Sequence, residues 1–297
     1  MVFLQKKKIK GKNYYYLVRT FRAEGRVIKK EKYIGKERPK DLKFRKLEFQ
    51  EEIIDNIKDA FNKYWKQLPE HEREKFNEEF SIVFTYDTNA IEGSTLTLKE
   101  TAELLRYNIT PKKNFKDILE AKSHNKAFLK MLGYKGELSI NALLRWHKDI
   151  FGQTKPDLAG KLRDYLVRVG DYIAPDWQDL DRLMGEFFEW HNKNKNMLHP
   201  VKLAALAHLK FAWIHPFGDG NGRISRLIMN FILHKNHYPL LDIPYKKRWD
   251  YYNAFKIYNR KKDESIFIKM IFDRYIAQNS KYITLKRITP KNPKSEE

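Results

Sequence analysis

The contiguous stretches LAALAHLKFAWI, HPFGDGNGRISR and LIMNFIL, which together make up residues 203–233, place a polar segment between two apolar ones. Apolar residues dominate both flanks, so we expect two buried helices joined by a short turn at residues 215–226. The turn holds a histidine, an aspartate, three glycines, an asparagine and two arginines, more than a simple connection requires. Binding and catalytic groups concentrate on loops carried by rigid elements, so this turn is the candidate site.

Three alternate positions of the turn are glycine: Gly218, Gly220 and Gly222. Glycine tolerates positive φ, so backbone N–H groups can converge on an anion, and the helix expected to begin near Arg223 adds its positive end. Arg223 and Arg226 are three residues apart and share a helix face, and two guanidinium groups suit a polyphosphate better than one carboxylate. The pattern therefore predicts a phosphate-binding site.

Two further side chains of the turn supply chemistry beside that site. Asp219 can hold Mg²⁺ through a carboxylate oxygen. His215, six residues before Asn221, is an uncharged base near neutral pH. A glycine-rich turn with a capping aspartate and solvated arginines would explain each residue singly. It does not explain the whole set, which predicts phosphoryl or nucleotidyl transfer.

The overall composition permits a large folded domain. The chain has 297 residues, 42% of them hydrophobic, no cysteine and a net charge of +21. Without cysteine, disulfides, thiolate catalysis and cysteine-ligated zinc are excluded. No segment is apolar over the roughly 18 residues that span a membrane, and the first residues lack the apolar stretch of a secretory signal. We expect a soluble, cytoplasmic protein with no membrane partner.

The positive charge is concentrated at the amino-terminal end. Residues 1–46 hold 17 Lys and Arg against 4 Asp and Glu, a net charge of +13. Residues 2–35 alternate β-rich runs with GKN and EG between them, which predicts a three-stranded meander. We assign residues 1–40 to this small basic β module, residues 41–280 to a helical domain and residues 281–297 to a disordered tail.

Helical periodicity dominates after Asp41, interrupted once by a hairpin. GKLRDYLVRVGDYIA, residues 160–174, alternates along the chain, and Gly170 with Asp171 supplies a turn. The fold class expected is mainly α with one β-hairpin, preceded by the meander. Helices are expected at about residues 41–68, 69–93, 97–108, 115–132, 139–151, 178–194, 201–214, 223–235, 247–261 and 265–278.

HPFGDGNGRISR resembles the signature of the Fic family of nucleotide-transferring enzymes, HPFx(D/E)GNGRxxR, with no departure. The likeness runs from about Thr88 to about Ile276, through segments such as RWDYYNAFKIYNR, especially in the branch that includes the animal endoplasmic-reticulum member. It implies the Fic fold, a helical bundle with a β-hairpin flap. It also implies a Mg²⁺-dependent protein adenylyltransferase that moves AMP from ATP to Ser, Thr or Tyr hydroxyls of target proteins.

The resemblance implies a role for each position of the motif. His215 matches the general base that takes the proton from a target hydroxyl, and Asp219 matches the Mg²⁺ ligand. Tyr252 and Asn259 would border adenine. The groups implied to bind the phosphates of ATP are Gly218, Gly220, Asn221, Gly222, Arg223 and Arg226.

The predicted hairpin corresponds to the family's flap. Its strand edge could pair with the backbone of a target and set the target's hydroxyl at the α-phosphate, whereas a hairpin that merely covers the core is the plain alternative. The residues implied to dock the target are Tyr165, Leu166, Val167, Arg168 and Val169.

A second motif precedes the core. TNAIEG, residues 88–93, matches the inhibitory pattern (S/T)xxxE(G/N) of the class II branch at Thr88, Glu92 and Gly93. The resemblance implies that Glu92 pairs with Arg226 and denies that arginine to the γ-phosphate. The enzyme would then restrain itself.

Two functions of different classes follow. The first is an adenylyltransferase held off by Glu92, with removal of AMP as a further activity. The second is a nucleic-acid-binding regulator in which residues 1–46 dock DNA or RNA and the Fic core is auxiliary, because YYYLVRTFR combines stacking rings with cations. A solvated sheet with lysine-guarded edges is the plain alternative. The target protein and the oligomeric state stay open, a homodimer being one option.

His147 and His208 are expected to be packed in the core.

Overall fold

The computed structural model describes residues 2–23 and 25–285. Contacts along the chain divide it into two compact units, which are described separately below. One unit comprises Met1–Gln67, His237–Pro239 and Ile271–Glu297. The other comprises Leu68–Asn236 and Leu240–Met270. The domain boundaries predicted at residues 40 and 280 stay a prediction.

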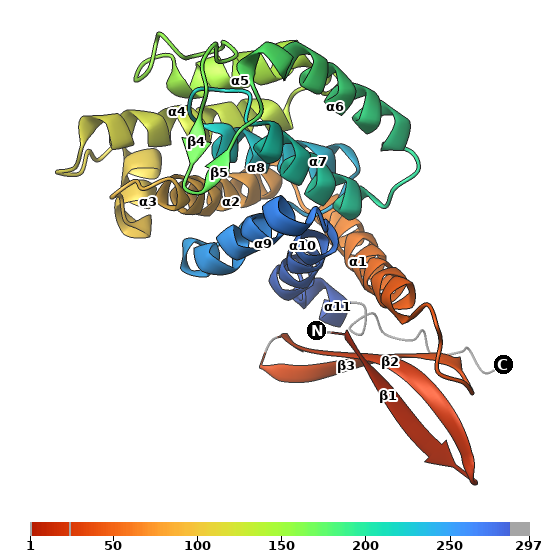
Figure 1. Ribbon diagram of the computed structural model, residues 1–297. Helices are drawn as coiled ribbons and strands as arrows, with labels where there is room; N and C mark the ends of the chain where they lie inside the picture. Colours follow the sequence, from red (N-terminus) through yellow and green to blue (C-terminus); the bar gives the residue numbers. More distant parts are fainter. Residues whose placement is uncertain (1, 24, 286–297) are drawn as a thin grey trace. The chain divides into compact units, whose positions relative to one another are not determined.

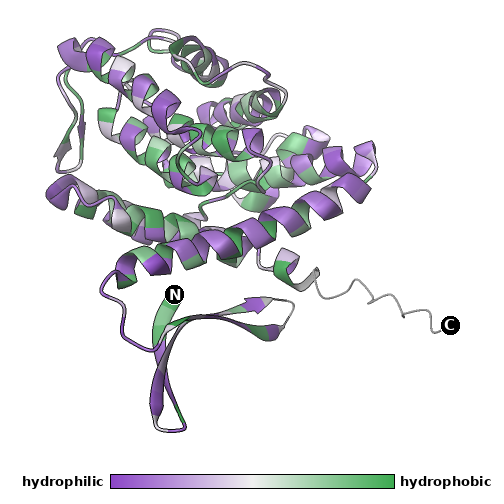
Figure 2. Cartoon of the chain, turned by 90° about the vertical axis from the view of Figure 1, so that its right-hand side faces the viewer, coloured by the Kyte–Doolittle hydropathy of each residue, from purple (hydrophilic) through white to green (hydrophobic). Residues whose placement is uncertain are grey.

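The first unit begins with the antiparallel meander that the sequence predicts. The strands β1 (Val2–Ile9), β2 (Lys12–Ala23) and β3 (Arg26–Gly35) pair in the order β1-β2-β3. The β1–β2 turn takes positive φ at Lys10 and Gly11, a combination whose twist suits a two-residue hairpin. The hairpin is hydrophilic over most of its length (Figure 2), as its run of lysines requires.

The first unit contains α1 (Leu42–Gln67), α11 (Lys281–Leu285) and the part of α10 from Ile271 onward; α1 and α11 contact each other. The helix α11 corrects one prediction, because its residues were assigned to a disordered tail. Tyr282 is buried and its ring packs edge-on against Phe61, with centroids 5.2 Å apart, so this apolar contact orders the segment. The remainder of the predicted tail, residues 286–297, lies outside the described residues.

The second unit is mainly helical, as predicted, and holds the candidate site. Figure 1 shows α7 and α8 in its middle, with the other helices around them. Every predicted helix of this unit is present within a few residues. They are α2 (Glu70–Ile91), α3 (Leu98–Tyr107), α4 (Phe115–Leu132), α5 (Ile140–Phe151), α6 (Leu180–Asn194), α7 (Pro200–Ile214), α8 (Asn221–Lys235), α9 (Arg248–Lys261) and α10 (Ser265–Gln278, to Met270 in this unit).

The central position of α7 and α8 follows from their composition. Both helices are buried along most of their length and must be surrounded by other elements. The helix α7 is apolar on nearly all faces, whereas α8 joins an apolar face to buried polar residues such as Arg223, Arg226 and Asn230. The outer helices carry local start signals instead. Ser139 accepts from the N–H of Ala142 at the start of α5, and Thr97 forms a capping box with Glu100 at α3. Within the described ranges, no helix is both long and apolar enough to cross a membrane.

The predicted hairpin is present but shorter than expected. Its strands are β4 (Arg168–Val169) and β5 (Tyr172–Ile173), joined by a turn with Gly170 at a φ of 58°. The predicted strand over residues 165–169 is therefore wrong for residues 165–167. Val167 still accepts across the hairpin from the N–H of Ala174 at 3.0 Å. Beyond it the pairing stops, because the guanidinium of Arg163 donates to the carbonyl oxygens of Tyr165 and Pro175.

Candidate functional site

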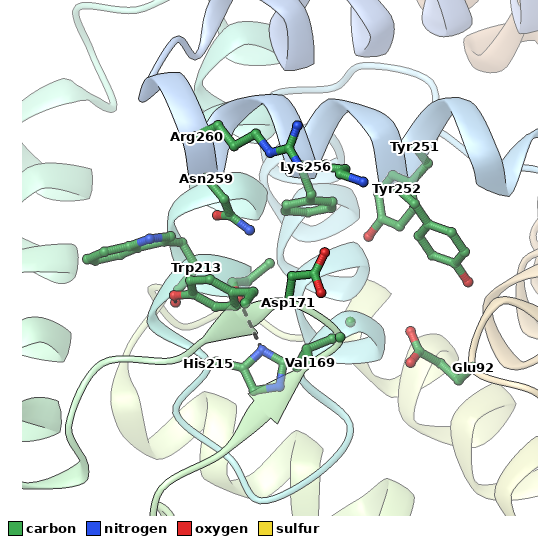
Figure 3. Close-up of a pocket in the computed structure, with 15 residues that line it drawn as sticks. Glu92, Val169, Asp171, Trp213, His215, Tyr251, Tyr252, Lys256, Asn259 and Arg260 are labelled. Atoms are coloured by element: carbon green, nitrogen blue, oxygen red, sulfur yellow. Dashed lines mark hydrogen bonds between the residues drawn. The ribbon is translucent and has the colours of Figure 1, made fainter.

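A cavity of about 630 Å³ opens between α9, the hairpin and the turn that joins α7 to α8. Figure 3 shows His215 below this cavity and Glu92 at one side, with Asn259 on α9 above. The cavity brings together residues from each part of the predicted site: the base, the glycine segment at the start of α8, the inhibitory carboxylate and the two residues expected beside adenine. Among its lining residues are Glu92, His215, Gly222, Tyr252 and Asn259.

His215 ends α7 in the left-handed conformation, with a φ of 54°, which turns its ring into the cavity. Its Nδ1 lies 3.2 Å from the carbonyl oxygen of Ala212. A carbonyl can only accept, so Nδ1 carries the proton and Nε2 keeps its lone pair. Burial lowers the pKa of His215, so the ring is neutral at pH 7. This is the state that a general base needs.

The anion nest is formed where α8 begins. The helix starts at Asn221, two residues before the predicted start, and Gly220 precedes it with a φ of +80°. The first N–H groups of a helix have no intrahelical acceptor and carry its positive end. The side chain of Asn221 does not face the nest, because it exchanges two hydrogen bonds with the backbone of Phe217. What Asn221 can offer a phosphate is therefore its backbone N–H.

Arg226 and the predicted inhibitory motif form one buried cluster. The Arg226 side chain is 1% exposed, and its Nη2 lies 2.6 Å from Glu92 Oε1. Thr88 accepts from Nε through its hydroxyl and from Nη2 through its carbonyl. Tyr251 Oη accepts from Nη1 at 3.2 Å. The predicted pairing of Glu92 with Arg226 is thus present in the structure.

The Glu92 carboxylate also lies directly over the nest. A Cβ atom added to Gly222 would clash with Glu92 Oε1. Glycine at 222 is therefore required for this close approach, quite apart from its backbone freedom. A negatively charged side chain this close to Gly222 would oppose an anion there by bulk and by charge.

Both carboxylate oxygens of Asp219 accept from a donor. Lys155 Nζ lies 2.5 Å from Oδ2, and the N–H of Gly220 donates to Oδ1 at 2.5 Å. Burial alone would raise the pKa of Asp219, but Lys155 and Arg223 hold it below its usual value. The carboxylate is therefore charged and chemically suited to Mg²⁺. Among the described residues no three acidic or histidine side chains cluster around one point, so the phosphates and water would supply the other ligands.

Arg223 lies 3.8 Å from Asp219 Oδ1 through Nη2 and has further partners on neighbouring helices. Its Nη1 donates to Glu120 of α4 and, at 3.2 Å, to Asn89 Oδ1, while its guanidinium lies 4.4 Å from the centre of the Phe151 ring. The buried Glu120 also pairs with Lys155. The sequence does not predict the roles of Lys155, Glu120 and Asn89, because a charged or amide side chain on a helix or in a loop carries no local signal of a distant partner.

Arg163 is a further residue that the sequence reasoning missed. Its Nε donates to the carbonyl oxygen of His215 at 2.8 Å, while its Nη atoms hold the carbonyls of Tyr165 and Pro175. One side chain therefore joins the backbone of the candidate base to both ends of the hairpin. Its position near the start of GKLRDYLVRVGDYIA gives no indication of this contact.

The two histidines predicted to be packed are buried as expected. His147 stacks on Phe217, accepts from the N–H of Gly160 at Nδ1 and places Nε2 2.9 Å from the carbonyl oxygen of Asp219. His147 thus also supports the turn. His208 Nε2 lies 2.9 Å from the hydroxyl of Tyr251.

The adenine-side residues both lie on α9. Tyr252 and Asn259 line the cavity, and the hydroxyl of Tyr252 donates to the carbonyl oxygen of Ile91 at 2.6 Å. Tyr252 therefore connects α9 to the end of the helix that carries Glu92. Of the flap residues, Val169 lines the cavity, while Leu166 is exposed and free of cavity contact.

Comparisons with known proteins agree with this geometry. The Fic/DOC family model matches residues 137–233. The chain is 35% identical over 227 residues to a protein adenylyltransferase Fic of Drosophila ananassae, covering 75% of this chain and 45% of that protein. A Fic domain containing signaling protein from Bacteroides thetaiotaomicron has a TM-score of 0.69 and 25% identity, covering 78% of this chain and 97% of that one. For residues 134–508 of Fic-1 from C. elegans, the TM-score is 0.68, the identity 25% and the coverage 82% and 74%.

The chain is a Fic-domain protein of the Fic/DOC family. The resemblance drawn from the HPFGDGNGRISR motif and the mainly helical Fic fold are both confirmed. The chain spans about half the length of the curated relatives that it matches, for example 45% of the Drosophila ananassae protein.

Proposed function

We propose that the chain is a protein adenylyltransferase that moves AMP from ATP to a hydroxyl group of a target protein. The observation that carries the proposal is the joint placement of His215, neutral with Nε2 unprotonated, and the glycine nest at the start of α8 in one cavity. A base beside an anion site is the arrangement that nucleotidyl transfer to a hydroxyl requires.

In the proposed reaction, Nε2 of His215 removes the proton from the target hydroxyl as its oxygen attacks the α-phosphorus. The bond between the α-phosphorus and the bridging oxygen breaks, and pyrophosphate leaves. Backbone N–H groups at Gly222 and Arg223, with the Arg226 guanidinium, hold the phosphates in place and offset charge on them. Asp219 would hold Mg²⁺, which neutralises phosphate charge and favours departure of pyrophosphate.

The proposed enzyme restrains itself through Glu92. Glu92 occupies the space over Gly222 and pairs with Arg226, so the phosphates of ATP must displace it before they bind productively. Thr88 supports the restraint, because it holds Arg226 from the same helix. Removal of AMP from a modified target remains part of the proposal as a second activity of the same cavity.

The hairpin is the proposed docking edge for the target. Val169 is exposed on the cavity side, where main-chain pairing would bring a target's hydroxyl toward His215. Arg163 fixes the hairpin to the backbone of His215. The hydrogen bonds of Arg163 thereby hold the hairpin at a defined distance from His215.

Autolabelling with α-labelled ATP tests the proposal. The Glu92→Gly variant should incorporate label into itself or into proteins of a lysate, whereas a Glu92→Gly/His215→Ala variant should not. Binding of an unhydrolysable ATP analogue by both variants is the control for folding. Equal labelling by both would refute the role of His215 and with it the reaction.

A second proposal concerns the amino-terminal module alone, because the comparisons favour adenylyl transfer over a regulator with an auxiliary Fic core. We propose that the module also contacts nucleic acid. Lys8, Lys10 and Lys12 are exposed at the β1–β2 turn. Nearby, the ring of Tyr33 lies 6.1 Å from that of Tyr14 and 5.4 Å from that of Tyr16. Cations beside rings suit phosphates and unstacked bases.

Charge substitution on the module tests this second proposal. A variant with Lys8, Lys10 and Lys12 changed to Gln should bind single-stranded oligonucleotide more weakly and with a smaller salt dependence than the parent. The matched control changes three exposed lysines of the second unit, namely Lys112, Lys116 and Lys193. Equal losses in both variants would show a general charge effect and no site on the module.

A further inference from the structure

Lys155 forms an ion-pair cluster beside the candidate metal ligand. It lies in the irregular segment that follows α5, and its Nζ is 2.5 Å from Asp219 Oδ2 and 2.9 Å from Glu120 Oε1. The lysine side chain is 12% exposed, and its ammonium lies 4.7 Å from the centre of the Phe151 ring. The lysine is therefore well shielded and bridges two carboxylates.

The two carboxylates differ in what else holds them. Glu120 is buried on α4, where it also accepts from Arg223 and from the hydroxyl of Thr154. The Asp219 side chain is 45% exposed, and of its two oxygens only Oδ1 has a backbone donor, from Gly220. Lys155 is thus anchored on Glu120 from the buried side and covers Oδ2 of Asp219 on the more accessible side.

We infer that Lys155 is a resident cation that competes with a divalent metal ion for Asp219 and withdraws onto Glu120 when metal and nucleotide bind together. The inference rests on the proposed role of Asp219 as the metal ligand. No covalent step is involved, since one cation replaces another at the carboxylate. Lys155 acts through Asp219 and is a positioning residue.

The electrostatics favour this exchange only when phosphates are present. Two carboxylates, Lys155 and Arg223 make a cluster with no net charge, so a metal ion arriving alone would be repelled by an ammonium at the oxygen it needs. Phosphates bring negative charge and further oxygen ligands for the metal ion. These interactions offset the free-energy cost of moving Lys155 away from Asp219. Glu120 remains as a partner for the displaced ammonium, so Lys155 is not left buried without a counter-ion. The protein would therefore take up metal with its nucleotide and discriminate against free metal.

Direct measurement of Mn²⁺ binding tests the inference without reliance on activity. The full chain is titrated with Mn²⁺, without nucleotide and with an unhydrolysable ATP analogue, and free Mn²⁺ is followed by its electron paramagnetic resonance signal. Lys155→Met removes the charge and keeps the apolar stem. Lys148→Met is the matched control, because Lys148 is an exposed lysine on the neighbouring helix α5 with the same charge. Asp219→Asn identifies the site.

Lys155→Met should bind Mn²⁺ at least about fivefold more tightly than the parent without nucleotide, and Lys148→Met should change the affinity less than about twofold. The increase in Mn²⁺ affinity should be smaller in the presence of the ATP analogue. It should be absent in the double variant Lys155→Met/Asp219→Asn. An unchanged or weaker Mn²⁺ affinity in a folded Lys155→Met variant would overturn the inference. If Asp219→Asn leaves Mn²⁺ binding unaltered in the presence of the analogue, the metal role of Asp219 fails as well, which separates the two failures.

Discussion

Replacing Glu92 by glycine should make the protein slightly less stable and much more active. Glu92 Oε1 lies 2.6 Å from the buried Arg226, so the substitution removes one partner of that guanidinium. The loss is moderated because Thr88 and Tyr251 still accept from Arg226. The Glu92 side chain is also 29% exposed, so the pair is partly hydrated. We expect a loss of about 1–2 kcal/mol from the pair and about 0.5–1 kcal/mol from glycine at a helix end.

The gain in activity can be estimated from the same geometry. A carboxylate about 4 Å from one phosphate charge costs about 4 kcal/mol at an effective dielectric constant of about 20. Partial exposure of Glu92 reduces this cost to roughly half, which still exceeds the roughly 1.4 kcal/mol of a tenfold rate change. We therefore expect at least about tenfold faster adenylylation at a limiting concentration of MgATP.

Two matched variants separate charge from bulk. Glu92→Gln removes the charge but keeps the side chain over Gly222, so it should activate less than Glu92→Gly. Arg226→Ala added to Glu92→Gly should abolish the gain, because the freed guanidinium is then missing. The assay is the initial rate of AMP transfer, with the melting temperature of each variant measured in parallel. A folded Glu92→Gly variant no faster than its parent would refute the inhibitory role.

Four further outcomes are expected from the structure. His215→Ala should abolish transfer and leave nucleotide affinity within a few-fold. Because burial lowers the pKa of His215, transfer by Glu92→Gly should be flat above pH 7 and fall only below the ordinary histidine value of 6.5; a fall beginning above pH 7 would contradict the assignment. Arg163→Met should lower the rate at least about tenfold at saturating ATP with little change in nucleotide affinity, since it loosens both the hairpin and the backbone of His215; an unchanged rate would remove its positioning role. Burial lowers the pKa of His124 to about 3 and that of His147 to about 4, so the unfolded chain binds more protons below pH 6.5. The melting temperature should therefore fall from pH 7 to pH 5, and a constant value would contradict buried, neutral rings.

The secondary structure and the chemistry of the central turn could be predicted from the order of the residues. Apolar periodicity placed the helices, because the side-chain repeat along a helix is a local property. Alternation and turn residues placed the meander in the same way, and it is present as β1, β2 and β3. The residues of the 215–226 turn indicated the family because their types and order are specific. Positive φ at His215 turns its ring toward the cavity, and positive φ at Gly220 leaves the first N–H groups of α8 accessible. Both depend on the local backbone conformation.

The pairing of distant charges could not be predicted, because it depends on how the chain packs. Arg226 and Glu92 are 134 positions apart, and Lys155 and Asp219 are 64 apart, so no local pattern could show either distance. The sequence anticipated the first pair solely through resemblance and missed the second. The predicted start of the strand at Tyr165 is wrong for the same reason, since Arg163 binds the carbonyl oxygens of Tyr165 and Pro175. The helix α11 was missed because its order comes from burial of Tyr282 against Phe61. Hydrogen bonds and ion pairs between distant segments depend on the packing of the whole unit, whereas secondary structure depends on neighbours along the chain.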